Sequence, residues 1–422
     1  MIRRVELCVL AIVLLVVAFS TGADFLFFVV YLGVLVVGGS YVLTRFGLSE
    51  LEAGYSLDRV QGRVGERLSA TYTVRNTSRL PKLWLEAYTP STLPIPLPGR
   101  GVALAPKEER SWIARVPLTR RGHYRVEPLV IRTGDPLGFF EASATVGAAA
   151  AVTVYPRVEL LPRWRLPPAA IEGTHSRPER TIQATPLVTS IRPYLPGDAY
   201  NRIHWKVSAR QGELQVKEFD LEQTADVWLF LDLERTVHTG GGDESTLEAG
   251  VRVAAAIAAQ ALLENRAVGM TASGHRVAVL PVDRGSRQHQ KVMQLLAAVM
   301  DDGSVPLVET LIAAMHRLRR GMTAVVVTPS VDREWVRPLA ALRGRGVAAV
   351  ACLLDGLAYE ERARQEAEQP PLGLEVREQR TRAQRAIRHA LSEYDVRVHT
   401  VVPDRPLGEL LVSGDQPARP AR

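Results

Sequence analysis

The chain has 422 residues, of which 46% are hydrophobic and 23% are charged. This is the composition of an ordinary globular protein with room for two or three domains. The formal net charge of +7 suits a protein beside anionic lipid or an acidic partner, but does not by itself indicate nucleic acid. The two cysteines, Cys8 and Cys352, each lie within an apolar run, far apart in sequence. They exclude a disulfide framework and a cysteine metal site, and they favour a reducing compartment.

Two apolar segments near the start predict a transmembrane helical hairpin over residues 1–46. Residues 5–20 carry one charge, and residues 25–43 carry none. At ~1.5 Å per residue, the second segment covers roughly 28 Å, enough to cross the hydrocarbon core of a bilayer. The first segment is shorter and follows two arginines, as a signal peptide does. It is therefore either the first helix of the hairpin or a cleaved leader.

Both alternatives place the rest of the chain on the same side of the membrane. Arg3, Arg4 and Arg45 flank the hairpin, whereas the connecting turn has no Lys or Arg. The positive-inside rule then puts both ends of a hairpin in the cytoplasm, and a cleaved leader gives the same result. We expect a multi-pass protein of the cell membrane with two helices, whose residues 46–422 are cytoplasmic.

Residues 54–157 read as a β-sandwich. Leu68, Ala70, Tyr72 and Val74 alternate with polar residues, the pattern of a half-buried strand. Later strands are expected over Val126–Ile131 and Ala144–Val154, with frequent Gly and Pro between strands and no long helical period. The block GDPLGFF at 134–140 predicts a tight turn followed by a strand, with both phenylalanines in the core.

A Pro- and Arg-rich stretch over 158–187 predicts a linker, and 413–422 a disordered tail. Between them, residues 188–412 alternate apolar runs with helical periods, which predicts a doubly wound α/β domain with a parallel sheet. Strands are expected at 227–232, 268–272, 276–282, 323–328, 347–354 and 396–402. Helices are expected at 245–265, 286–300, 306–320, 333–343, 360–368 and 380–394.

The stretch from Ser190 to Asp232 is the most informative part of the chain. Pro196-Gly197-Asp198 reads as a turn in which Asp198 caps a helix over 199–209, and Gly212 ends that helix. The apolar run VWLFL then leads into Asp232. An acid at the carboxyl end of a buried strand lies where open α/β sheets place their ligand sites.

Three blocks carry a family resemblance: Arg120 to Ser143, VTVYPRVELLP at 152–162, and PGD…RIHWK…ARQGEL…EF within 196–219. In order and spacing they resemble the family called domain of unknown function 58. The resemblance implies a membrane-associated protein with an immunoglobulin- or fibronectin-like β-sandwich and a C-terminal domain like von Willebrand factor A. It also implies an association with a MoxR-type AAA+ ATPase.

Domains like von Willebrand factor A often bind a divalent ion through Asp-x-Ser-x-Ser after their first strand. Here Asp232 is kept, Glu234 replaces the first serine and Thr236 offers a hydroxyl, but Pro329 stands where a later acid is expected. Asp332 substitutes for that acid only if its loop bends back. The resemblance therefore implies a degenerate magnesium site formed by Asp232, Glu234, Thr236 and Asp332. Because several positions depart from the pattern, we expect instead a capped strand end without metal, and no cofactor.

A cluster of charged residues in the core block predicts a docking surface for an acidic partner. Its members are Arg192, Asp198, Arg202, Lys206 and Arg210. The alternative is a set of intramolecular ion pairs with nearby acids, which contribute only ~0–1 kcal/mol each at a surface.

The P-loop, GxSxG, HExxH and CxxC signatures are all missing from the sequence. We therefore expect a non-enzymatic membrane-anchored adaptor that binds the bilayer and a protein partner, and no nucleic acid. The alternative is a metal-dependent hydrolase or phosphate-handling enzyme that uses Asp232 and Glu234.

Overall fold

The computed structural model describes residues 2–22, 24–161, 164, 188–195, 198, 200, 203–219 and 226–411. It divides the chain into two compact units. The N-terminal unit comprises Met1–Val158 with Met293–Val299, and the C-terminal unit comprises Glu159–Val292 with Met300–Arg422. Most of the predicted linker and all of the predicted tail lie outside the described residues.

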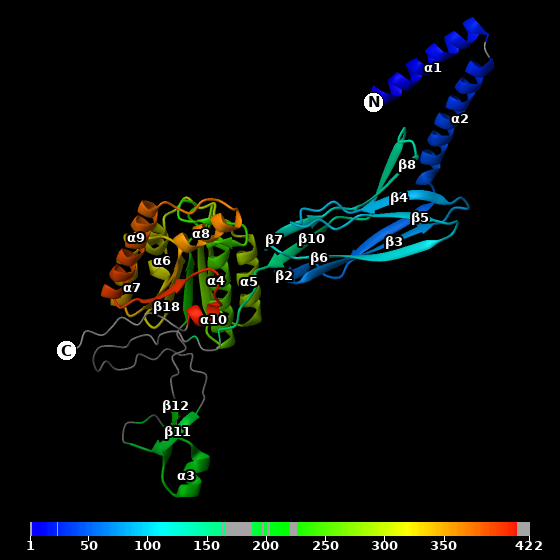
Figure 1. Ribbon diagram of the computed structural model, residues 1–422. Helices are drawn as coiled ribbons and strands as arrows, with labels where there is room; N and C mark the ends of the chain where they lie inside the picture. Colours follow the sequence, from blue (N-terminus) through cyan, green and yellow to red (C-terminus); the bar gives the residue numbers. More distant parts are fainter. Residues whose placement is uncertain are drawn as a thin grey trace. The chain divides into compact units, whose positions relative to one another are not determined.

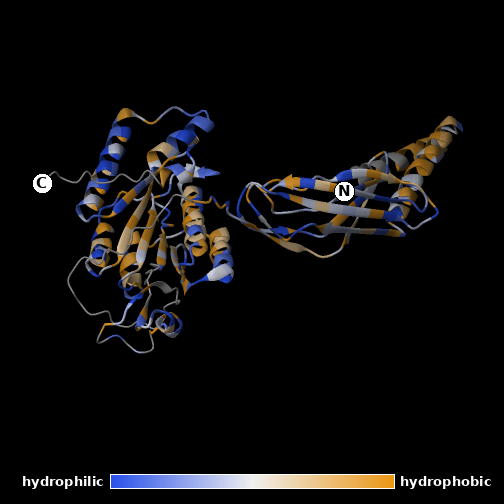
Figure 2. Cartoon of the chain, turned by 90° about the horizontal axis from the view of Figure 1, so that it is seen from below, coloured by the Kyte–Doolittle hydropathy of each residue, from blue (hydrophilic) through white to orange (hydrophobic). Residues whose placement is uncertain are grey.

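The chain begins with two helices, α1 (Ile2–Thr21) and α2 (Asp24–Gly47), separated by a turn in which Gly22 has a φ of +65° (Figure 1). The rings of Phe19 and Phe27 pack edge to face across this turn, with their centroids 5.1 Å apart. Figure 2 colours these two helices mostly as hydrophobic. α2 has the length and apolar composition of a membrane-spanning helix. α4 (Thr246–Leu263) passes the same test but is largely buried in the α/β domain.

A β-rich domain follows α2. Its strands form three sheets, ordered β1-β3-β6, β2-β10-β7 and β5-β4-β8-β9. Residues of all three sheets contribute to one apolar core. The strands are β1 (Leu51–Leu57), β2 (Gln61–Arg63), β3 (Arg67–Asn76), β4 (Lys82–Tyr88), β5 (Arg100–Leu104), β6 (Glu109–Pro117), β7 (Gly122–Val126), β8 (Leu129–Gly134), β9 (Glu141–Val146) and β10 (Ala150–Tyr155).

The alternation expected around residue 70 is confirmed, because Leu68, Ala70, Tyr72 and Val74 are all buried in the core. Three details differ from expectation. The segment 126–131 holds the end of β7 and the start of β8 rather than one strand. The segment 144–154 is two strands rather than one, because Gly147 turns the chain with a φ of +87°. The phenylalanines of the 134–140 block are only half-buried and do not belong to the core of the β-rich domain.

The α/β domain is built on a six-stranded sheet with the order β17-β16-β13-β18-β19-β20. The prediction of a parallel sheet is correct for five strands; β17, at the edge, pairs antiparallel with β16. Only the short turn at residues 274–276 joins these two strands, and a parallel pair needs a long crossover. The strands are β13 (Val227–Leu231), β16 (Val268–Ser273), β17 (Val277–Asp283), β18 (Thr323–Thr328), β19 (Ala348–Leu354) and β20 (Arg397–Val401).

Helices cover both faces of this sheet, as a doubly wound domain requires. One face packs against α6, α7 and α9 in a single buried cluster around Trp228 and Phe230. On the other face, Gly250 of α4 lies against Leu231, Val327 and Leu354. Besides α4, the helices are α5 (Gly285–Ala298), α6 (Leu307–Ala314), α7 (Val336–Gly344), α8 (Gly356–Glu366), α9 (Leu374–Glu393) and α10 (Leu407–Leu410).

A smaller element precedes the sheet in the chain. β11 (Val188–Pro193) pairs antiparallel with β12 (Gln215–Phe219), and α3 (Trp205–Gln211) lies between them. The helix was expected over 199–209 with Asp198 as its cap, which is wrong. α3 begins after His204, whose ring nitrogen accepts from the N–H of Val207. Gly212 ends the helix with a φ of +75°, as expected.

Candidate functional site

The order of strands places Asp232 at the reversal point of the sheet, where successive connections change from one side of the first strand to the other. β13 is the first strand of the sheet in the chain, and its neighbours β16 and β18 lie on opposite sides of it. The connections therefore diverge there, which is the place where open α/β sheets generally bind their ligands. Asp232 follows β13 directly, and Thr328 is the last residue of β18. The position expected for Asp232 from the sequence is confirmed.

The Asp232 carboxylate is fully buried, and both of its oxygens accept hydrogen bonds. Oδ2 accepts from the Thr328 hydroxyl at 2.6 Å, and Oδ1 accepts from the backbone N–H of Glu234 at 3.1 Å. Burial raises the pKa of Asp232 to about 6, although these two hydrogen bonds oppose the shift. The geometry is that of a carboxylate that caps the end of a strand, with a proton affinity far above that of an ordinary Asp.

The loop after Asp232 is fastened to the start of α4 by a histidine that the sequence analysis did not single out. The Nε2 of His238 lies 3.0 Å from the Asp232 carbonyl oxygen, so it carries the proton, and Nδ1 lies 3.0 Å from the Thr246 hydroxyl. Burial lowers the pKa of His238. The neutral ring therefore connects the end of β13 to the beginning of α4 through two hydrogen bonds. The one signal in the sequence that indicates a role for His238 is its position six residues after Asp232.

A second loop is held against the same strand end through Gly303. Its N–H donates to the Leu233 carbonyl at 3.0 Å, and its own carbonyl accepts from the Arg235 N–H at 2.9 Å. A Cβ at Gly303 would lie 2.2 Å from the Ser273 carbonyl oxygen. Backbone from three segments thus meets at a distance that only glycine permits.

The residues expected to hold magnesium make local contacts instead of forming one ligand set. The Thr236 hydroxyl donates to the Glu234 carboxylate. Asp332 accepts from the Glu334 N–H at 3.1 Å, and its own N–H donates to Ser330. Within the part of the chain that the structure describes, no group of three His, Cys, Asp or Glu side chains could hold a metal ion. The absence of a cofactor, with a degenerate magnesium site at Asp232, Glu234, Thr236 and Asp332 as the alternative, stays a prediction.

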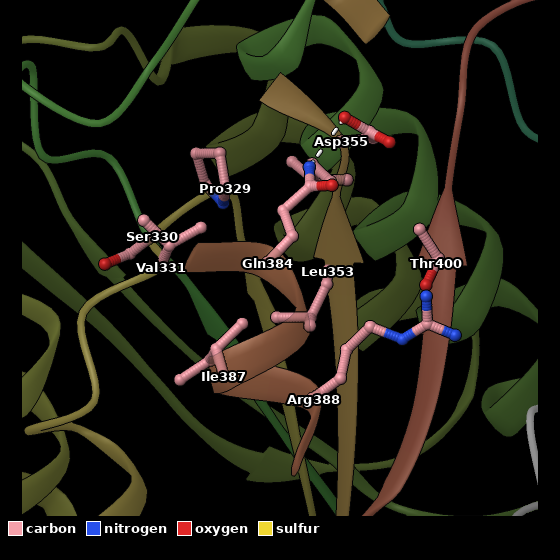
Figure 3. Close-up of a pocket in the computed structure, with 10 residues that line it drawn as sticks. Pro329, Ser330, Val331, Leu353, Asp355, Gln384, Ile387, Arg388 and Thr400 are labelled. Carbon is pink, nitrogen blue, oxygen red and sulfur yellow. Dashed lines mark hydrogen bonds between the residues drawn. The ribbon is translucent and has the colours of Figure 1, made fainter. Parts of the chain in front are cut away.

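A pocket of about 50 Å³ adjoins the loop after β18 (Figure 3). Within it, Gln384 Nε2 donates to Asp355 Oδ1 at 2.6 Å, and the same oxygen accepts from the Ala358 N–H. Its volume suits one or two water molecules and falls well below the ~300–1,000 Å³ of typical ligand sites. Its lining is Pro329, Ser330, Val331, Leu353, Leu354, Asp355, Gln384, Ile387, Arg388 and Thr400.

The charged residues of the core block divide into two groups. Arg192 makes two hydrogen bonds of 2.8 Å to the Asp198 carboxylate, so this pair is an intramolecular ion pair. Lys206 and Arg210 are exposed on α3. Arg202 lies outside the described residues. The structure thus supports the ion-pair alternative for Arg192 and Asp198, and it leaves the two α3 cations accessible.

Exposed aromatic rings accompany these cations. Trp205, at the start of α3, is 65% exposed, and Tyr200 is 72% exposed. The Tyr200 ring stacks on that of Tyr194 at a centroid distance of 6.1 Å. The segment 194–210 therefore presents aromatic and cationic side chains together.

Comparison with solved structures finds only partial resemblance. The CARDB domain of a Pyrococcus furiosus protein aligns with 25% of this chain and 91% of its own length, at 17% identity and a TM-score of 0.19. A human complex of zinc α2-glycoprotein and prolactin-inducible protein aligns with 24% of this chain and 92% of the matched chain, at 12% identity and the same TM-score. Resemblance at this level carries no functional argument.

Comparison with curated sequences finds bacterial relatives. The uncharacterized protein YeaD of Bacillus subtilis is 26% identical over 296 residues, covering 67% of this chain and 69% of YeaD. An uncharacterized protein of Mycobacterium tuberculosis is 29% identical over 160 residues, covering 36% of this chain and half of the relative. Residues 190–386, which contain most of β11, all of α3 and Asp232, match the family model described as protein of unknown function DUF58. In this segment the chain is similar to the DUF58 family.

Proposed function

We propose that this protein is a membrane-anchored, non-enzymatic adaptor that uses the α3 segment to dock an acidic protein partner. The observation that carries the proposal is the exposed group formed by Tyr200, Trp205, Lys206 and Arg210. Trp, Tyr and Arg are the residues that most often dominate the energy of a protein interface. The group lies within the segment that matches the family model.

The anchor in this proposal is the helical hairpin of α1 and α2, with the rest of the chain in the cytoplasm. Support comes from the apolar length of α2 and from Arg45 in its last turn. The arginines at the chain start and the absence of Lys and Arg from the turn favour the same orientation. The β-rich domain, which we assign as an immunoglobulin-like sandwich, would then space the α/β domain from the bilayer.

We further propose that the α/β domain is of the von Willebrand factor A type and that its partner is a MoxR-type AAA+ ATPase. The strand order, with one antiparallel edge and an acid at the reversal point, supports this fold. The partner is what the family resemblance implies. Charge contacts between Lys206, Arg210 and an acidic partner would mainly set encounter rate and specificity, and they would weaken with salt.

One observation favours a second function, a metal-dependent hydrolase. Asp232 is buried at the reversal point with a pKa raised to about 6, and perturbed carboxyls cluster at catalytic sites. Against it, both carboxylate oxygens already accept hydrogen bonds from the chain itself. Hydrolysis of a phosphate ester that requires magnesium and disappears in Asp232→Asn would favour this alternative over the adaptor.

The adaptor proposal is tested by charge reversal on α3. Lys206 and Arg210 are four residues apart and share one helix face. The double variant Lys206→Glu and Arg210→Glu, in the full chain solubilised from membranes, should lose most capture of the co-purified AAA+ ATPase at low salt. The matched control is Arg317→Glu with Arg319→Glu, two exposed positions in the same domain that give the same change in net charge.

The control should capture the ATPase as the unmodified chain does, and both double variants should remain folded, because exposed substitutions usually shift stability by only ~0.5 kcal/mol. Equal capture by the α3 variant and the unmodified chain would place the docking surface elsewhere. Equal loss in both double variants would show that net charge, rather than the α3 face, determines binding.

A further inference from the structure

The end of α2 is built into the β-rich domain of the N-terminal unit. Lys82, at the start of β4, is buried, and its Nζ donates to the carbonyl oxygens of Phe46 at 2.6 Å and Ser49 at 2.8 Å. A Cβ at Gly47 would lie 2.7 Å from the Thr133 side chain. The ammonium group thus satisfies carbonyls at the C-terminus of the helix, and the close approach fixes α2 against β4 and β8.

The turn between β8 and β9 contacts α2 more than a helical turn before its end. The ring of Phe140 packs edge to face on that of Tyr41, with centroids 5.6 Å apart. The Asp135 carboxylate accepts a hydrogen bond from the buried Ser40 hydroxyl. Ser40 precedes Phe46 by six residues, which is about 9 Å of helix. The turn therefore reaches back along α2, in the direction of its apolar middle, as Figure 1 shows for the β8 hairpin.

Asp135 satisfies the backbone N–H groups of this turn. Its carboxylate accepts from the N–H groups of Leu137 at 3.0 Å and Phe140 at 2.6 Å, and from that of Phe139. Its carbonyl oxygen accepts from Gly138 at 3.1 Å. The remaining residue of the turn is Pro136, which has no N–H. Every backbone N–H of the turn is thus paired within it, which lowers the cost of placing this irregular backbone where water is scarce.

The depth of this turn follows from the length of α2. About 20 residues cross a hydrocarbon core of ~30 Å, so a span that begins at Phe25 ends near Thr44. Ser40 and Tyr41 then lie within about 6 Å of the boundary between acyl chains and headgroups. At that level the turn exposes Leu137, which is 56% open. Trp84, 44% exposed and beside Gly134, adds an aromatic ring of the kind found at membrane interfaces.

We propose that residues 136–139 are a second membrane contact, with Leu137 inserted into the phospholipid bilayer beside α2. The inference rests on the proposed membrane anchoring through α2. The turn contacts α2 at Ser40 and Tyr41, its backbone N–H groups are paired, and it presents an apolar side chain. Together with the Lys82 contacts, it would hold the β-rich domain at a fixed tilt to the membrane rather than on a loose tether.

Site-specific labelling of the full chain in lipid nanodiscs tests this proposal. Single cysteines are introduced as Leu137→Cys, Leu35→Cys in α2 and Val60→Cys, each in a Cys8→Ala background, and labelled with an environment-sensitive nitrobenzoxadiazole dye. Val60 is the matched control, because it is an aliphatic residue in a loop with 53% exposure. It follows β1, whose seven residues lead about 23 Å from the end of α2. The background chain, with the buried Cys352, measures nonspecific labelling.

The label at position 137 should emit at shorter wavelength than the label at position 60. It should also be quenched by nitroxide lipids, most strongly by those with the nitroxide near the headgroup. The label at position 35 should be quenched by nitroxides deep in the acyl chains. A water-like, unquenched label at 137 together with a quenched label at 35 would overturn this proposal alone. Unquenched labels at both positions would overturn the membrane anchoring itself.

Discussion

Replacing Asp232 with asparagine should stabilise the α/β domain at neutral pH, and the gain should shrink as the pH falls. In the folded chain, burial raises the pKa of Asp232 from 3.8 to about 6. A carboxyl that binds its proton more tightly in the folded state supports folding at low pH. That support is lost as the pH rises from the unfolded pKa through the folded one. The ionised carboxylate is therefore a cost to the fold at pH 7.5.

The magnitude follows from the two pKa values. The cost of ionising Asp232 in the folded state is about 3 kcal/mol at pH 7.5 and about half of that at pH 5. Asparagine fits the same hydrogen bonds if its oxygen accepts from the Glu234 N–H and its amide donates to the Thr328 hydroxyl oxygen. The gain from Asp232→Asn should therefore be larger at pH 7.5 than at pH 5, by about 1 kcal/mol.

Hydrogen exchange measured by mass spectrometry on peptides from β13 and β18, at pH 5 and pH 7.5, reports the opening free energy of this region. The control is Asp283→Asn. A backbone hydrogen bond from Arg284 and the nearby Lys291 hold the pKa of Asp283 below its usual value. That group stays ionised across the window, so its substitution should have an effect that does not change with pH.

Two results would refute the reasoning. Equal effects of Asp232→Asn at both pH values would show that Asp232 does not titrate between them. A loss of stability that grows toward pH 7.5 would show that the charge is stabilised in the folded chain, as a bound cation would do.

Three further predictions concern topology, metal and backbone packing. A reporter fused after Arg422 should behave as cytoplasmic, and activity of that fusion outside the cell would overturn the orientation. Calorimetry of the solubilised chain should show no stoichiometric micromolar magnesium binding, since Pro329 stands where an acid is expected; such binding, abolished by Asp232→Ala, would contradict this. Gly303→Ala should destabilise the α/β domain by more than ~2 kcal/mol, because its Cβ would meet backbone oxygen at 2.2 Å. Gly344→Ala, where the Cβ meets nothing within 4 Å, should be neutral or stabilising in thermal unfolding.

The kinds of element along the chain were readable from local pattern. The run VWLFL predicts a strand buried on both faces, and the alternation around Tyr72 predicts a strand buried on one face; the structure has both. Gly212 marks the end of a helix because a left-handed residue is needed there, whatever surrounds it. The position of Asp232 at the carboxyl end of a central strand follows equally from the order of strands and helices.

Which side chains pair with one another was decided only by tertiary structure. Asp198 was expected to cap a helix, but β11 brings the Arg192 guanidinium beside it, and that pair replaces the cap. The phenylalanines of the 134–140 block were expected in the core, but Asp135 closes the turn so that Phe140 meets Tyr41 of α2. Local periodicity determines how a segment satisfies its own backbone hydrogen bonds. The partner of a polar or aromatic side chain depends on segments far away in sequence, whose approach only the assembled fold determines.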